Sequence, residues 1–248
     1  QSCTAGLGYV IDNIQQTVDF YLQSPSLPLL TRLTDYLALT RHGLYLYKHY
    51  LPQELVKRIQ ENLKWCLHQL TWVEPAKQVN ELMEKSGYFR KHLEISPSLV
   101  TELKLKRKNL PDLEELSSLF YSERFNALQL DLLQLLLMEN QFNSGDDDEF
   151  SLNTLAIRCL DKSLATLTDV MPAKKVLEVE TYVEQHQELR RSLLTGFWFG
   201  GLFDGDAREE FRKPWFDLKQ GIDELETLSF LKQQINLLNT ESSDVESD

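Results

Sequence analysis

The chain has 248 residues, of which 42% are hydrophobic and 26% charged, and these proportions are typical of a globular protein with a sizeable core. Its formal net charge of −12 argues against general nucleic-acid binding, which needs a basic surface. No apolar run reaches the length of about 18 residues that predicts a transmembrane helix, so we expect no membrane partner.

The cysteines and the first residues bear on the cellular setting. Cys3, Cys66 and Cys159 lie far apart and form no CxxC pair, which argues against a disulfide framework or a zinc site. A reducing, cytoplasmic setting is the simplest interpretation. The chain begins QSCTAGLGYV, without an initiator Met or a signal-peptide pattern, and we expect it to be a fragment of a longer protein.

Apolar residues recur every three or four positions through the first half, which predicts helices. The first predicted helix covers 7–22, and six of its residues share one apolar face: Leu7, Val10, Ile11, Ile14, Val18 and Tyr21. The second covers 29–50, and a third starts at Pro52, which suits a first helical turn. Further breaks are expected at Pro75, Gly87 and Pro97.

The second half has the same character and carries an acidic loop. Its predicted helices cover 113–140, 151–170, 177–203 and 207–238, and Pro214 divides the last one or lies within it. Residues 143–149, NSGDDDE, predict an exposed acidic loop. The run 146–149 contributes four negative charges and the tail contributes four more, so the rest of the chain carries −4 and is compatible with a local basic surface.

These patterns predict an all-α protein of about eight helices in two similar antiparallel bundles. We place the first bundle at 1–94, a connector at 95–112, and the second bundle at 113–239. The connector holds a basic patch, KLKRK, and residues 240–248 are expected to be a disordered acidic tail. The two halves show only a faint internal repeat.

The templates of known catalytic chemistry are absent from the sequence. It contains no GxGxxG, Walker A, HExxH or GxSxG pattern. Gly200-Gly201 is more consistent with close packing or a helix bend than with a phosphate loop. His42 and His49 lie two helical turns apart, too far for one metal site without a third ligand between them. We therefore predict no catalytic site, metal site or cofactor.

The candidate binding residues are basic side chains on the predicted helices. Each one alone is more often a solvated charge or an ion-pair partner. Gathered on one face, they would bind a polyanion, because Arg and Lys donate charge-assisted hydrogen bonds to phosphate oxygens. The candidates are Arg41, Lys48, Arg158, Lys162, His186, Arg190 and Arg191.

Aromatic residues gather near the end of the second half. They are Phe197, Trp198, Phe199, Phe203, Trp215 and Phe216. Aromatic side chains at helical spacing usually bury against other helices, so we predict that this cluster belongs to the core, with a protein interface as the alternative.

Six segments carry a family resemblance. They are ALTRHGLYLYKHYLPQELVKRI, LKWCLHQLTWVEPAKQVNEL, YSERFNALQLDLLQLLLMENQF, FSLNTLAIRCLDKSLATL, ELRRSLLTGFWFGGLF and FDLKQGIDELETL. The chain resembles a CHAD domain, the conserved histidine α-helical domain. The likeness is greatest to the C-terminal CHAD-like half of bacterial proteins whose N-terminal half is a CYTH-type triphosphatase domain. This resemblance implies two four-helix bundles and a basic groove that binds inorganic polyphosphate.

The chain departs from the family's pattern at several basic positions. Its first half keeps only Arg41. In the second half Arg190 and Arg191 keep the basic pair, while His186 stands where the family has an Arg. The resemblance therefore implies weak polyphosphate binding, centred on the second half, so that loss of Arg190 and Arg191 should matter more than loss of Arg41.

Two functions follow from the resemblance, and neither is catalytic, because the chain lacks the ExExK strand of a CYTH triphosphatase. The first is a module that binds polyphosphate or a similar polyanion. The alternative is a structural or protein-interaction module, accessory to a triphosphatase domain outside this chain. Basic side chains gathered in one concave groove would favour the first function, and basic side chains scattered among acids would favour the second.

Overall fold

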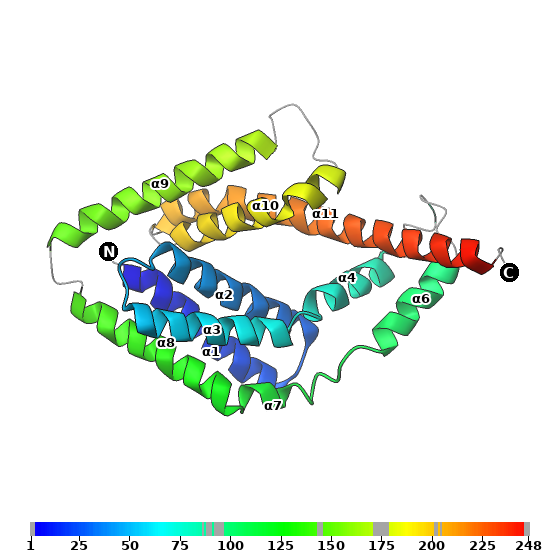
Figure 1. Cartoon of the computed structure of the whole chain (residues 1–248), viewed down its shortest axis with the longest axis horizontal. Helices are drawn as coiled ribbons and strands as arrows, with labels where there is room; N and C mark the ends of the chain where they lie inside the picture. The colour runs from blue at the N-terminus through cyan, green and yellow to red at the C-terminus, as the bar shows by residue number, and fades with distance from the viewer. Residues whose placement is uncertain are drawn as a thin grey trace.

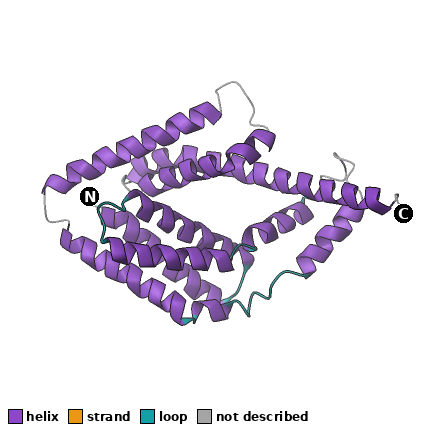
Figure 2. Ribbon diagram, in the orientation of Figure 1, coloured by secondary structure: helices purple, strands orange, loops and turns teal. Residues whose placement is uncertain are grey.

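The computed structural model describes residues 3–85, 87, 91, 97–142, 146–170, 179–200, 203 and 205–245. Every regular element in these ranges is a helix, which confirms the predicted all-α class (Figure 2). The helices are α1 (Cys3–Gln23), α2 (Leu27–Leu46), α3 (Gln53–Gln69), α4 (Val73–Glu84), α6 (Pro97–Lys108), α7 (Ser117–Phe120), α8 (Glu123–Phe142), α9 (Asp146–Val170), α10 (Val179–Phe199) and α11 (Gly205–Val245).

Helices α1, α2, α3 and α8 pack together as one bundle around the largest hydrophobic core (Figure 1). The apolar face predicted for the first helix is buried along its whole length, from Leu7 to Tyr21. On α2, Leu30, Leu33 and Leu37 are at most 1% exposed. Burying a side chain of this size stabilises the fold by roughly 1.5–3 kcal/mol, so this core holds α2 firmly in place.

Helix α10 lies on the other side of α2 and also contacts α9 and α11. Two glycines allow close approach of neighbouring aromatic rings. A Cβ at Gly43 of α2 would overlap the Trp198 ring, and a Cβ at Gly196 of α10 would overlap the Trp215 ring. Between the same helices His42 Nε2 lies 2.8 Å from Thr195 Oγ1. These contacts fix α10 against α2 and α11.

Helix α11 runs from α10 to the far end of the molecule, where it contacts α4 and α6 (Figure 1). Leu231 of α11 packs there with Val79, Leu82, Leu99 and Leu103 in a second core cluster. Pro214 lies within α11, so the single-helix alternative is the one observed. Since α2 and α4 lie on one side and α10 and α11 on the other, the two sides enclose a space.

The arrangement differs from the predicted organisation in three places. Helix α6 occupies most of the expected connector, and its last turn holds Lys106, Arg107 and Lys108 at the helix end that favours cations. Helix α8, predicted within the second bundle, packs against α1 and α3. Helix α9 begins at Asp146, inside the expected acidic loop, and helix α11 continues to Val245, inside the expected disordered tail. Residues 143–145 and 246–248 lie outside the described residues.

In the described part of the chain, no helix combines the length and the apolar character needed to cross a bilayer.

Candidate functional site

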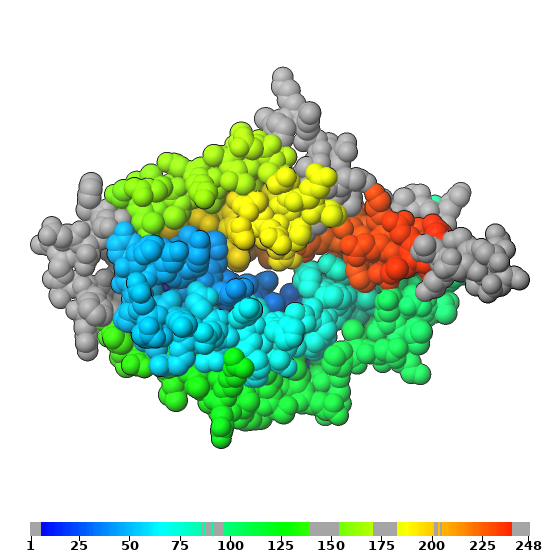
Figure 3. Space-filling model, in the orientation of Figure 1, coloured from blue at the N-terminus to red at the C-terminus, as the bar shows by residue number. Residues whose placement is uncertain are grey.

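A cavity of about 300 Å³ lies between α2 and α4 on one side and α10 and α11 on the other. The space-filling view shows the hollow between these two sides (Figure 3). Its volume is at the lower end of the range of small-molecule pockets. Its walls combine charged, aromatic and aliphatic side chains, including Arg32, Asp35, Tyr36, Leu39, Glu74, Lys77, Arg190, Leu194, Trp198, Arg208, Arg212, Phe216, Lys219 and Asp223.

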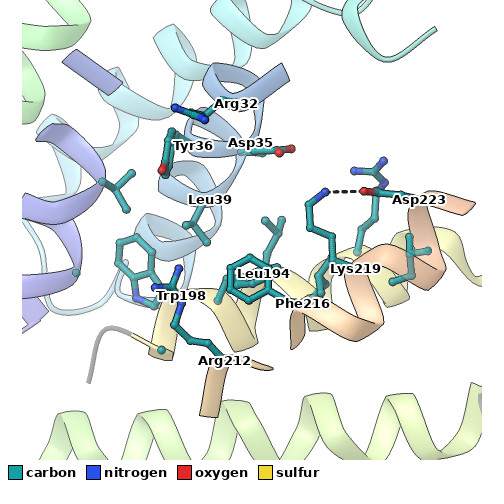
Figure 4. Close-up of a pocket in the computed structure, with 18 of the residues that line it drawn as sticks. Arg32, Asp35, Tyr36, Leu39, Leu194, Trp198, Arg212, Phe216, Lys219 and Asp223 are labelled. Carbon is teal, nitrogen blue, oxygen red and sulfur yellow. Dashed lines mark hydrogen bonds and ion pairs between the residues drawn. The ribbon is translucent and has the colours of Figure 1, made fainter. Parts of the chain in front are cut away.

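Four residues on one face of α11 form one wall of this cavity. Arg212, Phe216, Lys219 and Asp223 follow one another at intervals of three or four residues and share one face of the helix. The wall therefore changes along its length from cation to aromatic ring to an ion pair (Figure 4). The seven residue steps from Arg212 to Lys219 extend about 10 Å along the helix axis.

Arg32 of α2 and Arg212 of α11 line the cavity on either side of Tyr36, and we call this part of it the arginine end (Figure 4). Both guanidinium groups are close enough to the Tyr36 hydroxyl to oppose the rise in its pKa, which burial and the neighbouring Tyr9 cause. Arg212 also lies over the Phe216 ring, 5.3 Å from its centroid. Neither arginine forms an ion pair with a carboxylate of the described residues. This end is therefore suited to an anion.

Arg208 and Tyr36 complete this end. Arg208 Nε donates a hydrogen bond of 2.6 Å to the Phe203 carbonyl oxygen, which ties the first turns of α11 to the preceding residue. The Tyr36 hydroxyl donates to Asn13 Oδ1 at 3.0 Å, which fixes the ring across α1 and α2. These bonds hold the two side chains in place at the cavity wall.

A second group of charged side chains, which we call the carboxylate end, holds Asp35, Glu74, Lys77, Arg190, Lys219, Asp223 and Glu226. Lys219 Nζ lies 2.7 Å from Asp223 Oδ2, and Lys77 Nζ lies 3.6 Å from the same atom. Arg190 Nε donates to Glu226 Oε1 at 2.7 Å. Four acids and three bases lie together here, so the charges of this group nearly balance one another.

Two carboxyl groups at the carboxylate end bind their protons more tightly than usual. Burial, opposed by Lys77 and reinforced by Glu226, raises the pKa of Glu74 to about 7. Burial also raises the pKa of Asp35, although Lys219 and Lys77 oppose the rise. The Asp35 side chain is accessible only from within the cavity, where protein surrounds it on several sides, so its solvation is incomplete.

The raised pKa of Glu74 makes the stability of the fold depend on pH. Below its ordinary value of 4.5, Glu74 is protonated in both the folded and unfolded states. Between pH 4.5 and about 7 the unfolded state ionises first, so the free energy of unfolding falls as pH rises through this window. We expect the free energy of unfolding to fall by about 1 kcal/mol across this window. Water screening keeps the fall this small, because the Glu74 side chain is 36% exposed.

Urea unfolding at several pH values measures this loss. Glu74→Gln should remove the part of the slope that Glu74 causes, while Glu84→Gln, at the exposed end of the same helix, should keep the parent slope. An unchanged slope in Glu74→Gln would contradict the assignment.

The structure places the seven predicted binding residues in several locations. Arg190 alone among them lines the cavity. Arg191, its neighbour, bonds Glu188 at 2.7 Å on the exposed side of α10. The other five are exposed: Arg41 on α2, Lys48 beyond its end, Arg158 and Lys162 on α9, and His186 on α10. The structure therefore does not gather the seven residues in one groove, and by the criterion stated above these seven residues favour the interaction module.

The predicted aromatic cluster is divided between core and cavity. Trp198, Phe199 and Trp215 are at most 6% exposed, as expected for core residues. Phe216 is 50% exposed and lines the cavity, and Phe197 lines it as well. The core prediction is confirmed for the first three, while Phe216 contributes an apolar surface to the candidate site.

The histidines of the described residues show no metal-binding arrangement. Burial and the nearby Arg191 lower the pKa of His42 to about 4, so His42 is neutral near pH 7 and serves the α2–α10 contact. No three His, Cys, Asp or Glu side chains of the described residues lie together in a way that could hold a metal ion.

Comparisons with protein-family models, curated proteins and solved structures find no match to the chain. The fold and the site thus define an all-α protein with a cavity lined by arginines, aromatic rings and a cluster of paired acids and bases. The CHAD resemblance stays a prediction that rests on the six sequence segments.

Proposed function

We propose that this chain is a non-catalytic helical module that weakly binds a phosphate-bearing anion, such as inorganic polyphosphate, at the arginine end of the cavity. The observation that carries the proposal is the pair Arg32 and Arg212, which both line the cavity, act on the Tyr36 hydroxyl and have no ion-pair partner among the described residues. Guanidinium groups suit phosphate because their planar donors match its oxygens.

The arginines of the cavity contrast with the acidic character of the whole chain. The chain carries −12, yet three arginines line this end of the cavity: Arg32, Arg208 and Arg212. Walls of low dielectric constant strengthen the field of such a group in the hollow. The CHAD resemblance supports the same class of ligand, although it pointed to other residues.

Titration calorimetry with long-chain polyphosphate and with tripolyphosphate at low salt tests the proposal. We expect weak binding of both, and its weakening as salt rises, because ions screen exposed charges over about 10 Å at 0.1 M. An absence of binding by both ligands at low salt would refute the proposed function.

A protein-interaction module is the second candidate, and an exposed apolar strip on α8 favours it. Leu130, Leu133 and Leu137 are 67%, 37% and 66% exposed and share one face of the helix. An accessory role beside a CYTH-type triphosphatase domain would cover this strip. Mixing the chain with such a domain should then give a complex in sedimentation, and Leu130→Lys with Leu137→Lys should abolish it. A complex that survives both changes would remove the strip as the contact.

A further inference from the structure

We propose that the cavity binds a small organic phosphate that carries an aromatic ring, with its phosphate on Arg212 and its ring against Phe216 and Trp198. This inference rests on the proposed anion site and narrows the class of its occupant. Two features of the cavity carry it. Apolar side chains surround Arg212, and packing contacts hold the Arg212 side chain beside them.

The part of the cavity around Arg212 has apolar walls. Leu39 of α2, Trp198 of α10 and Phe216 of α11 line it on three sides (Figure 4). Phe216 is 50% exposed, so its ring has uncovered surface to offer to an occupant. The Phe197 ring packs edge-on against Phe216, with 5.0 Å between the ring centroids, and holds that ring in place. A rigid aromatic surface is therefore available inside the cavity.

The Arg212 side chain is held at this apolar surface. Its guanidinium carbon lies 5.3 Å from the centroid of the Phe216 ring. Its aliphatic stem packs on Gly200, where an added Cβ would lie only 3.1 Å from Arg212 Cγ. Arg212 forms no ion pair with a carboxylate of the described residues. An anion bound by this guanidinium group therefore lies next to an aromatic ring.

The other cations of the cavity are engaged with acids of the chain. Lys219 Nζ lies 2.7 Å from Asp223 Oδ2, and Lys77 Nζ lies 3.6 Å from the same oxygen. Arg190 donates a hydrogen bond to a carboxylate oxygen of α11. A phosphate at these cations would compete with a carboxylate that is already in place. The arginine end is thus the better position for the phosphate.

These surroundings favour an aromatic phosphate ester over an inorganic polyanion. A polyphosphate chain against Leu39 and Phe216 would lose water from its charged oxygens without gaining hydrogen bonds there. An ester places its charge on Arg212 and an apolar ring against the apolar walls. Aromatic rings packed edge-to-face or offset attract each other beyond the effect of burial alone. One ring with its phosphate suits a cavity of about 300 Å³.

Phenyl phosphate and methyl phosphate are matched probes, since both are phosphate monoesters and only the first has a ring. At pH 7.5 and low salt, calorimetry should show phenyl phosphate bound about tenfold more tightly, the lower limit for burial of an aromatic side chain. Phe216→Ala should reduce this ratio to below about threefold, because it removes the surface that the ring contacts.

Phe20→Ala is the control for this change. Phe20 is 52% exposed, close to the value for Phe216, but it lies on α1 and is not among the residues that line the cavity. It should leave the ratio of the two affinities unchanged. Arg212→Gln should weaken both probes by the same factor, since the phosphate is common to them. Circular dichroism confirms that each variant is folded.

The outcomes separate this inference from the proposed function. Equal binding of the two probes, or a ratio that Phe216→Ala leaves unchanged, overturns the aromatic-phosphate proposal, and so does a ratio that Phe20→Ala lowers as much. If tripolyphosphate still binds in that case, and Arg212→Gln weakens it, the anion site stands. If neither probe binds and tripolyphosphate also fails to bind, both proposals fail.

Discussion

Gly196→Ala should lower the free energy of unfolding by about 2 kcal/mol. The added Cβ would overlap the rigid Trp215 ring, which is itself only 6% exposed and has little room to move. Such overpacking costs about 3 kcal/mol, whereas the better helix propensity of Ala returns about 1 kcal/mol. The clash is the larger effect, so the net change is destabilising. Urea unfolding followed by circular dichroism measures it.

Gly221→Ala is the matched control for this change. Gly221 also lies inside a helix, but a Cβ there would have no atom within 4 Å. The propensity effect then acts alone, and we expect stabilisation by up to about 1 kcal/mol. If the two substitutions changed stability in the same direction, the close packing of α10 on α11 at Trp215 would be wrong.

Sequence periodicity predicts which segments form helices, but it does not predict which helices pack against one another. Periodicity identified the buried face of α1, from Leu7 to Tyr21, because that face is a property of the segment itself. It could not show that α8 packs against α1 and α3, since an apolar face can be buried against any neighbour of suitable shape. Helix α6 was missed because Pro97 and a run of basic residues were interpreted as a connector.

The candidate site was largely beyond prediction for the same reason. Arg32 and Arg212 are 180 positions apart in the sequence and line the same cavity only because α2 and α11 both contribute to its walls. Arg190 and Arg191 were predicted together, yet neighbouring residues on a helix point about 100° apart, as 3.6 residues per turn requires. Arg190 thus lines the cavity and Arg191 bonds Glu188 outside it. The spacing of Arg212, Phe216, Lys219 and Asp223 is the one local signal of a functional face on α11.

The double change Arg32→Gln with Arg212→Gln should weaken tripolyphosphate binding by about a hundredfold. Each charge-assisted hydrogen bond to phosphate contributes about 1.5–3 kcal/mol, which corresponds to at least about tenfold in affinity for each arginine. Gln keeps much of the length and polarity of Arg and removes its charge. Because neither arginine holds an ion pair with a described carboxylate, the change should leave the free energy of unfolding nearly constant.

Arg41→Gln with Lys48→Gln is the control for the double change. Both side chains carry the same charge but are exposed outside the cavity, at the end of α2. If binding depends on position in the cavity, this control loses less than about threefold, as screening of exposed charges implies. If binding depends only on total charge, the two double variants lose equal affinity, and the arginine end of the cavity is not the site. Titration of both proteins at the same low salt concentration distinguishes these results.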